Sequence, residues 1–242
     1  MHVHLPKPLH GWREFAGEVG IIVVGVLIAL GAQQVVETLH WRHEAAAARD
    51  AIGGQIDQDY FDAAELAIAQ PCIDRQLQSL EQALLVPGAY RPVPSFTEGS
   101  LEFTFRAPSR PWSDDLWQSA KSDGTAAHFD PALRQGLASY YANANDMREE
   151  NAVAESLQWK LRVLARPIQP DAATRVALLA DIEQARGIYG LMALAANQLI
   201  EAAQSMKFTS SPANLRADGS GTLKFCRAHH LPLGGINPQR PH

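Results

Sequence analysis

Carboxylate and imidazole side chains occur close together at Glu37-Thr-Leu-His40, with Glu44 one helical turn later. On a helix these three positions share a face, so their side chains could converge on a metal ion. Di-metal bundles, however, need a second Glu-x-x-His helix and two further glutamates. The chain contains no second Glu-x-x-His, so only a homodimer could complete such a site. We expect instead polar residues that flank an apolar helix.

Other reactive residues form no recognisable catalytic motif. His2, His4 and His10 lie in a short terminal tail, which is a poor scaffold for a preorganised site. The chain has no Gly-x-Ser-x-Gly elbow, phosphate-binding loop, dinucleotide fingerprint or zinc-type cysteine cluster. The sequence therefore assigns no catalytic, cofactor-binding or metal-binding residue and predicts no cofactor. We expect a protein that is not an enzyme.

Cys72 and Cys226 are the only cysteines of the chain. In an oxidising compartment they could form one disulfide. The alternative is two buried, reduced thiols, the usual state of free cysteines, and we take it as the default.

An uncharged, largely apolar segment runs from Val19 to Val36. Eighteen helical residues extend about 27 Å, close to the ~30 Å of hydrocarbon in a bilayer. Trp12 and Trp41 lie beyond its ends, where aromatic rings favour the membrane interface. We predict a transmembrane helix over residues 19–36, preceded by an N-terminal tail over residues 1–18. A cleaved signal peptide or a buried core helix would be the alternatives, because the purely apolar part is only about 14 residues long.

In and around this segment the chain carries the motifs Trp12-Arg-Glu-Phe-Ala-Gly-Glu18, Gly25-Val-Leu-Ile-Ala-Leu30, Gln33-Gln34 and His40-Trp41-Arg42. These motifs resemble a family of uncharacterised bacterial single-pass membrane proteins. A weaker similarity covers Leu116 to Gly124 and the pair Tyr140-Tyr141. The resemblance implies an uncleaved span followed by a helical domain, and it implies no catalytic residues.

The charges that flank the span do not decide its orientation. Lys7 and Arg13 precede the span, and Arg42 and Arg49 follow it, so the positive-inside count is tied. Long domains translocate largely regardless of charge. We expect a bacterial inner-membrane protein with its soluble domain in the periplasm, and a cytoplasmic domain stays open as the alternative.

Past the span, apolar residues at helical spacing predict a helical soluble domain over residues 37–206. Gly53-Gly54 weaken its first helix, and Pro71 should break or restart it. A proline-rich insertion over residues 86–111 separates this helix from the later ones. Those should begin near Ser113, after an N-cap at Asp130 and near Pro170-Asp171, with Gly124 in a left-handed position.

Residues 207–242 are rich in Gly, Pro, Ser and Asn, and we expect a loosely ordered C-terminal tail. Leu101–Phe105 and Thr222–Cys226 alternate apolar and polar residues, so they could pair as a small two-stranded ribbon or be extended loops. The predicted fold class is all-α, with the span continuing into an irregular antiparallel helical bundle.

Composition narrows the function without identifying it. The chain has 242 residues, 46% hydrophobic and 19% charged, with a net charge of −5, which excludes a disordered chain and argues against nucleic acid as a partner. The expected partners are the lipid bilayer and a second membrane protein or second copy, since Gly25 and Ala29 form a small-x-x-x-small step. We expect a binding, scaffold or accessory protein of the envelope. The alternatives are a membrane-tethered metalloenzyme with a dimeric Glu-x-x-His site and an envelope sensor.

Overall fold

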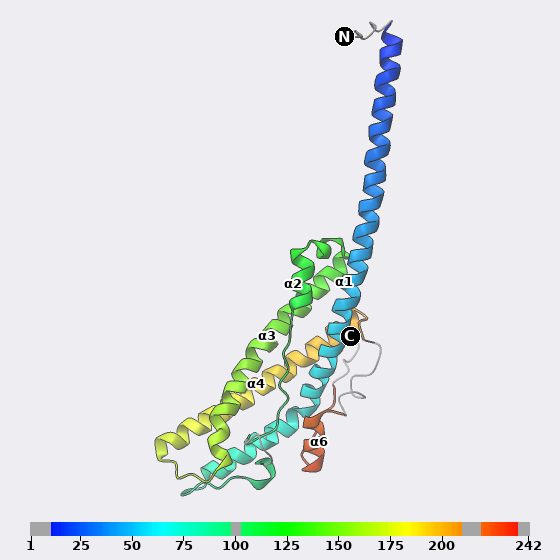
Figure 1. Cartoon of the computed structure of the whole chain (residues 1–242). Helices are drawn as coiled ribbons and strands as arrows, with labels where there is room; N and C mark the ends of the chain where they lie inside the picture. The colour runs from blue at the N-terminus through cyan, green and yellow to red at the C-terminus, as the bar shows by residue number, and fades with distance from the viewer. Residues whose placement is uncertain (1–10, 98–102, 210–218, 237–242) are drawn as a thin grey trace, which may run out of the picture.

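The computed structural model describes residues 11–97, 103–209 and 219–236, and the described part is helical without a strand (Figure 1). The all-α fold class is therefore confirmed. The α-helices are α1 (Trp12–Leu85), α2 (Asp115–Ser122), α3 (Pro131–Leu161), α4 (Ala172–Ser205) and α6 (Gly221–Ala228). Three short 3-10 helices connect them: η1 (Pro94–Phe96), η2 (Thr125–His128) and η3 (Arg162–Ala165).

Helix α1 comprises 74 residues and joins the apolar segment to the domain without a linker. Its N-terminal part extends alone beyond the other helices, and its C-terminal part lies among them (Figure 1). It begins at Trp12, so residues 12–18 belong to this helix and not to the expected N-terminal tail. At 1.5 Å per residue, α1 has a contour length of about 110 Å.

The predicted break at Pro71 is wrong, because α1 passes through this residue. A proline removes one backbone donor and leaves the carbonyl four residues earlier without its helical partner. Here the C-terminal segment covers that turn: the Gly234 N–H donates to the Ile68 carbonyl at 2.8 Å. A Cβ added to Gly234 would stand 3.2 Å from the Ala67 carbonyl oxygen and 3.3 Å from the Pro71 ring, so this segment packs closely on the turn. Tertiary packing at the proline therefore accompanies the continuous helix.

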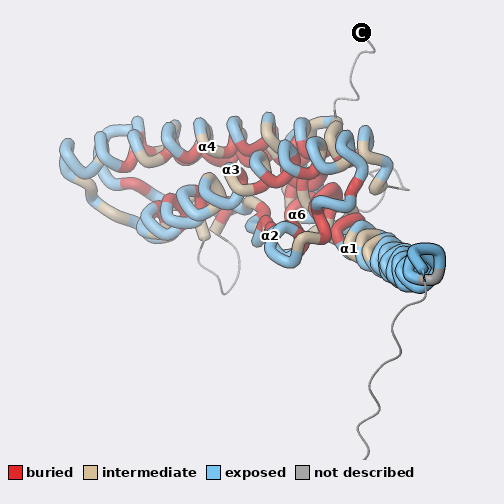
Figure 2. The backbone as a smooth tube through the Cα atoms, turned by 90° about the horizontal axis from the view of Figure 1, so that it is seen from above, coloured by how far each residue is buried: buried red, intermediate tan, exposed pale blue. Residues whose placement is uncertain are grey.

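Helix α4 runs antiparallel to both α1 and α3. Arg175, near the start of α4, donates to the Leu84 carbonyl near the end of α1, whereas Gln204 at the other end donates to the Tyr60 hydroxyl at 3.0 Å. On the α3 side, Lys160 pairs with Asp181 at 3.5 Å. Buried residues line the facing sides of these helices, while the N-terminal part of α1 is exposed all round (Figure 2).

Two helix starts follow the predicted local signals. The Asp130 carboxylate accepts hydrogen bonds from the backbone of Ala132 at 2.9 Å and Leu133 at 3.4 Å, and Asp171 accepts from Thr174 at 2.7 Å. These are N-caps that satisfy donors left free at a helix start. Gly124 adopts φ +87°, the left-handed conformation expected where α2 ends.

Neither the possible ribbon nor an extended loop is observed at Thr222–Cys226, because these residues lie within α6. Part of the other candidate strand, 101–105, is outside the described residues. Such a short segment also fits a helix when its buried residues are three or four positions apart. Here the buried Cys226 follows Leu223 by three positions and Thr222 by four. The Ser220 hydroxyl caps this helix by accepting from the Leu223 N–H at 3.1 Å. Residues 219–236 are thus not the expected loose tail but a segment packed on α1.

Candidate functional site

The residues of the alternative metal site, Glu37, His40 and Glu44, lie on the exposed part of α1. His40 Nδ1 stands 4.0 Å from Glu44 Oε1, and these side chains are 60% and 48% exposed. Within residues 11–97, 103–209 and 219–236, no group of three or more His, Cys, Asp or Glu side chains is placed to hold a metal ion. The fold brings no further ligand to Glu37 and His40, so a site completed by a second copy stays a hypothesis.

An aromatic contact joins α1, just beyond the apolar segment, to η2, the short helix that precedes α3. The rings of Trp41 and His128 stack with centroids 4.2 Å apart and planes at 12°. The turn between α2 and η2 makes this contact, because the left-handed Gly124 sends the chain back toward α1. Gly124 itself lies against the Trp41 ring, with 3.9 Å between the ring and the place of a Cβ.

Two hollows flank this stacked pair. The first, of about 400 Å³, opens toward the apolar segment and is lined by Gln34, Glu37, Thr38, Trp41, Arg42 and His128. The second, of about 570 Å³, lies farther along α1, between it and the ends of α3 and α4. It is lined by Ala45, Ala46, Arg49, His128, Phe129, Asp130, Ala132, Leu133, Gly136, Ser205 and Met206. Both can receive part of a partner molecule at the end of the domain nearest the apolar segment.

A buried acidic cluster lies deeper in the domain, on one face of α1. Asp59, Asp62 and Glu65 follow one another at three-residue spacing, and Asp59 and Glu65 are buried. Arg110, from the segment before α2, pairs with Asp62 at 3.1 Å and more closely with Glu65. One guanidinium thus pairs with two of the three carboxylates, those of Asp62 and Glu65.

The third carboxyl of this cluster, Asp59, has a raised pKa. Burial is the main cause that raises the pKa of Asp59 from 3.8 to about 7, and the charge of Asp62 raises it further. The Tyr140 hydroxyl donates to Asp59 at 3.3 Å and opposes the rise. Asp59 therefore changes its protonation state near neutral pH.

The paired tyrosines of α3 bind two different side chains of α1. Tyr140 donates to Asp59, whereas the Tyr141 hydroxyl donates to the side-chain oxygen of Gln55 at 3.1 Å. The Gln55 amide group donates in turn to the Ser113 carbonyl. Both tyrosines thus have a role in helix packing, which their sequence spacing did not show.

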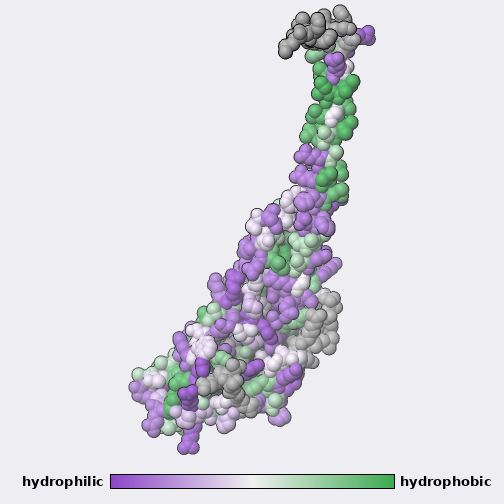
Figure 3. All heavy atoms as spheres, viewed as in Figure 1, coloured by the Kyte–Doolittle hydropathy of each residue, from purple (hydrophilic) through white to green (hydrophobic). Residues whose placement is uncertain are grey.

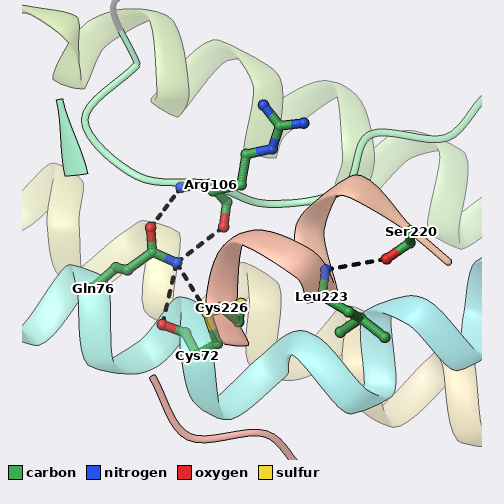
Figure 4. Close-up of a disulfide and its surroundings, with 6 residues drawn as sticks. All are labelled: Cys72, Gln76, Arg106, Ser220, Leu223 and Cys226. Atoms are coloured by element: carbon green, nitrogen blue, oxygen red, sulfur yellow. Dashed lines mark hydrogen bonds between the residues drawn. A yellow bond between two sulfur atoms is a disulfide. The ribbon is translucent and has the colours of Figure 1, made fainter. Parts of the chain in front are cut away.

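Cys72 and Cys226 form a disulfide with Cα atoms 6.0 Å apart, so the default of two reduced thiols is wrong (Figure 4). The bond ties α6 to α1 across 154 residues of sequence. Next to it, the buried Gln76 side chain accepts from the Arg106 N–H at 2.6 Å and donates to the Arg106 carbonyl at 3.1 Å. Gln76 therefore holds the backbone at Arg106, which lies before α2, beside the disulfide.

Comparison with models of known protein families, with curated proteins and with solved structures finds no match for this chain. Sequence reasoning missed the pairs Trp41–His128 and Asp59–Tyr140, whose members are far apart along the chain. A local signal existed only for Asp59, Asp62 and Glu65, whose three-residue spacing places acids on a face that also carries core residues.

Proposed function

We propose that this chain is a single-pass inner-membrane protein of the bacterial envelope, whose periplasmic helical domain acts as a scaffold or accessory subunit by binding a partner. The proposal is carried by the exposure of the apolar segment of α1. Its most apolar 18-residue window has a mean hydropathy of 2.3 and none of it is buried in the protein. Figure 3 shows this apolar band on the part of α1 that extends from a predominantly polar domain.

A membrane would remove the cost of this exposed apolar surface. Burial of apolar area is worth roughly 25 cal/mol per Å², so a whole exposed helix turn favours lipid over water by several kcal/mol. A core helix of a soluble protein would bury such a stretch inside the fold, and α1 does not. The helix also continues directly into core positions such as Ile52 and Ile56, which supports a retained anchor over a removable leader.

The disulfide between Cys72 and Cys226 supports a periplasmic domain. Disulfides persist in oxidising compartments and are rare where thiol-reducing systems operate. The disulfide thus favours one orientation, whereas the tied count of flanking charges favours neither.

A binding role is supported by the hollow of about 570 Å³. Its lining is mainly alanine, leucine, phenylalanine and methionine, and Arg49 and Asp130 are charged groups at its wall. Apolar walls with few charged groups suit recognition of an apolar partner surface. The hollow lies close to the anchor, so such a partner would itself be held at the membrane.

The test uses the full chain in native membranes. We expect the protein to resist carbonate extraction, and a reporter fused after residue 242 to be active only in its periplasmic form. Crosslinking in the same membranes, followed by mass spectrometry, should identify neighbours that contact residues 45–49 or 129–136. Release by carbonate, or a mature chain that begins after residue 36, would contradict the anchor. A cytoplasmic reporter signal would contradict the orientation.

A further inference from the structure

The hollow beside Trp41 lies at a defined depth if residues 19–36 span the bilayer. Counted from the midpoint of that segment, Glu37 lies about 14 Å and Arg42 about 22 Å along the helix axis. The hydrocarbon of a bilayer extends about 15 Å from its centre and the headgroup region about 20–22 Å. Glu37 thus stands at the hydrocarbon boundary and Arg42 at the outer limit of the headgroups.

The fold gives this part of α1 a second wall that a bare span lacks. Gln34, Thr38 and Trp41 lie along one face of the helix, and His128 from η2 stacks on Trp41 and closes the hollow on the domain side. Together with Glu37 and Arg42, these side chains line the hollow of about 400 Å³. A further hollow, also of about 400 Å³, adjoins it and is lined in addition by Gly31, Val35 and Leu39. An acyl chain would lie along these three residues.

Two opposite charges face this hollow without a partner in the described part of the chain. Glu37 and Arg42 both line it, and neither forms an ion pair or a side-chain hydrogen bond with residues 11–97, 103–209 or 219–236. The charges of Glu37 and Arg42 in the lining are opposite and equal. A matching ligand therefore carries both a cationic donor and an anionic acceptor.

We propose that this hollow binds the headgroup of phosphatidylethanolamine from the adjacent leaflet, a proposal that rests on the membrane anchor proposed above. The primary ammonium donates to the Glu37 carboxylate, and the phosphate oxygens accept from the Arg42 guanidinium and an imidazole N–H of His128. Charge-assisted hydrogen bonds of this kind are stronger than neutral ones. The stacked pair Trp41–His128 then fixes the distance between the domain and the membrane surface.

The charges of the lining select this lipid over two others. An anionic glycerol headgroup offers no cation to Glu37 and leaves that carboxylate opposite a phosphate. A choline headgroup carries the same charges, but its quaternary ammonium has no N–H to donate. Phosphatidylethanolamine satisfies both charged side chains together.

The test measures lipids retained by the full-length protein in native mass spectrometry. Detergent-purified protein is equilibrated with equal amounts of phosphatidylethanolamine, phosphatidylcholine and phosphatidylglycerol that share the same acyl chains. We expect a preference of about fivefold for phosphatidylethanolamine over phosphatidylglycerol, the ratio that one exposed charge pair supplies. The choline lipid should be retained less than the ethanolamine lipid.

Charge variants make the outcome decisive. Glu37→Gln gives the lining a net positive charge, so the preference should shift to phosphatidylglycerol, whereas Arg42→Gln should lower the retention of all three lipids. Glu44→Gln removes the same charge from the same helix outside the hollow, and it should leave the wild-type ratio unchanged. Equal retention of the three lipids by the wild-type chain would overturn the proposal, as would equal shifts for Glu37→Gln and Glu44→Gln.

A failed anchor is recognised separately, by flotation of each variant with vesicles and by carbonate extraction. Protein that carbonate removes contradicts the proposed function itself. Protein that stays in the vesicles without a lipid preference contradicts only the headgroup site.

Discussion

The ring of Phe208 lies on Gly53, so close that a Cβ added to the glycine would stand 2.8 Å from the ring Cδ1 atom. The guanidinium of Arg49 lies 5.5 Å from the centre of the same ring. The absence of a side chain at Gly53 therefore lets Phe208, which follows α4, pack directly on α1. A larger residue at position 53 would clash with its ring. Its neighbour Gly54 is exposed and has nothing within 4 Å of a Cβ position.

The two glycines should respond to alanine with opposite signs. We expect Gly54→Ala to raise the free energy of unfolding by about 0.5–1 kcal/mol, because alanine favours the helix. Gly53→Ala has the same helical gain but must displace Phe208, and we expect a net loss of about 1 kcal/mol from overpacking. Thermal unfolding of both variants checks this pair. A stabilised Gly53→Ala would contradict the packing of Phe208.

Asp59 should make the stability depend on pH. Its folded-state pKa of about 7 lies above that of the unfolded chain, so the folded state binds the proton more tightly. The free energy of unfolding should therefore fall as pH rises from about 4 to about 7, by at most about 4 kcal/mol. Asp59→Asn keeps the Tyr140 contact without the charge and should flatten this slope.

The measurement for Asp59 is chemical unfolding at pH 5 and pH 7.5 in the same detergent. The difference between wild type and Asp59→Asn isolates this residue from the other carboxyls. Glu44→Gln, on the exposed part of α1, is the control and should keep the wild-type slope. An identical slope in Asp59→Asn would show that another group titrates.

The loss of Arg110 should destabilise the domain through the carboxylates it leaves behind. In Arg110→Gln, the buried Glu65 and the partly buried Asp62 lose their cation, and we expect a cost of about 2–4 kcal/mol. The cost should be smaller at pH 5, because burial already raises the pKa of Asp62 and its protonation relieves part of the unpaired charge. Arg134→Gln, an exposed arginine of α3, should change stability by less than about 0.5 kcal/mol.

Reduction of the disulfide should weaken both the fold and the attachment of α6. The bond closes a loop of more than 154 residues, so its loss is expected to cost about 2–5 kcal/mol. The Cys72→Ala/Cys226→Ala variant should unfold earlier than wild type and no longer respond to dithiothreitol. In hydrogen exchange, residues 221–234 should lose protection before α3 and α4 do. Equal stability with and without reductant would contradict the structural role of this bond.

Local sequence signals were sufficient for the helical class and for several boundaries. The apolar segment, the N-caps at Asp130 and Asp171 and the left-handed Gly124 depend on interactions within a few residues. Such interactions are the same in any surrounding fold, so residue type and spacing predict them.

Local signals were misleading at Pro71 and at Thr222–Cys226. An isolated helix would tend to break at the proline, but the Gly234 N–H and the packing of residues 231–236 support that turn here. The five alternating residues fit a strand and a short helix equally well, and burial of Leu223 and Cys226 against α1 accompanies the helix. Contacts with distant segments outweighed the local preference in both places.

Residue types and spacing alone were enough to predict a helical chain, one long apolar segment near its start and the beginnings of α2, α3 and α4. The tertiary structure alone decided that Cys72 meets Cys226, that Tyr140 meets Asp59 and that His128 covers Trp41. The physical reason is the range of the forces involved. Helix period and capping act within one or two turns, whereas these pairs exist only after packing of α1 and the later helices has brought distant residues within a few ångströms.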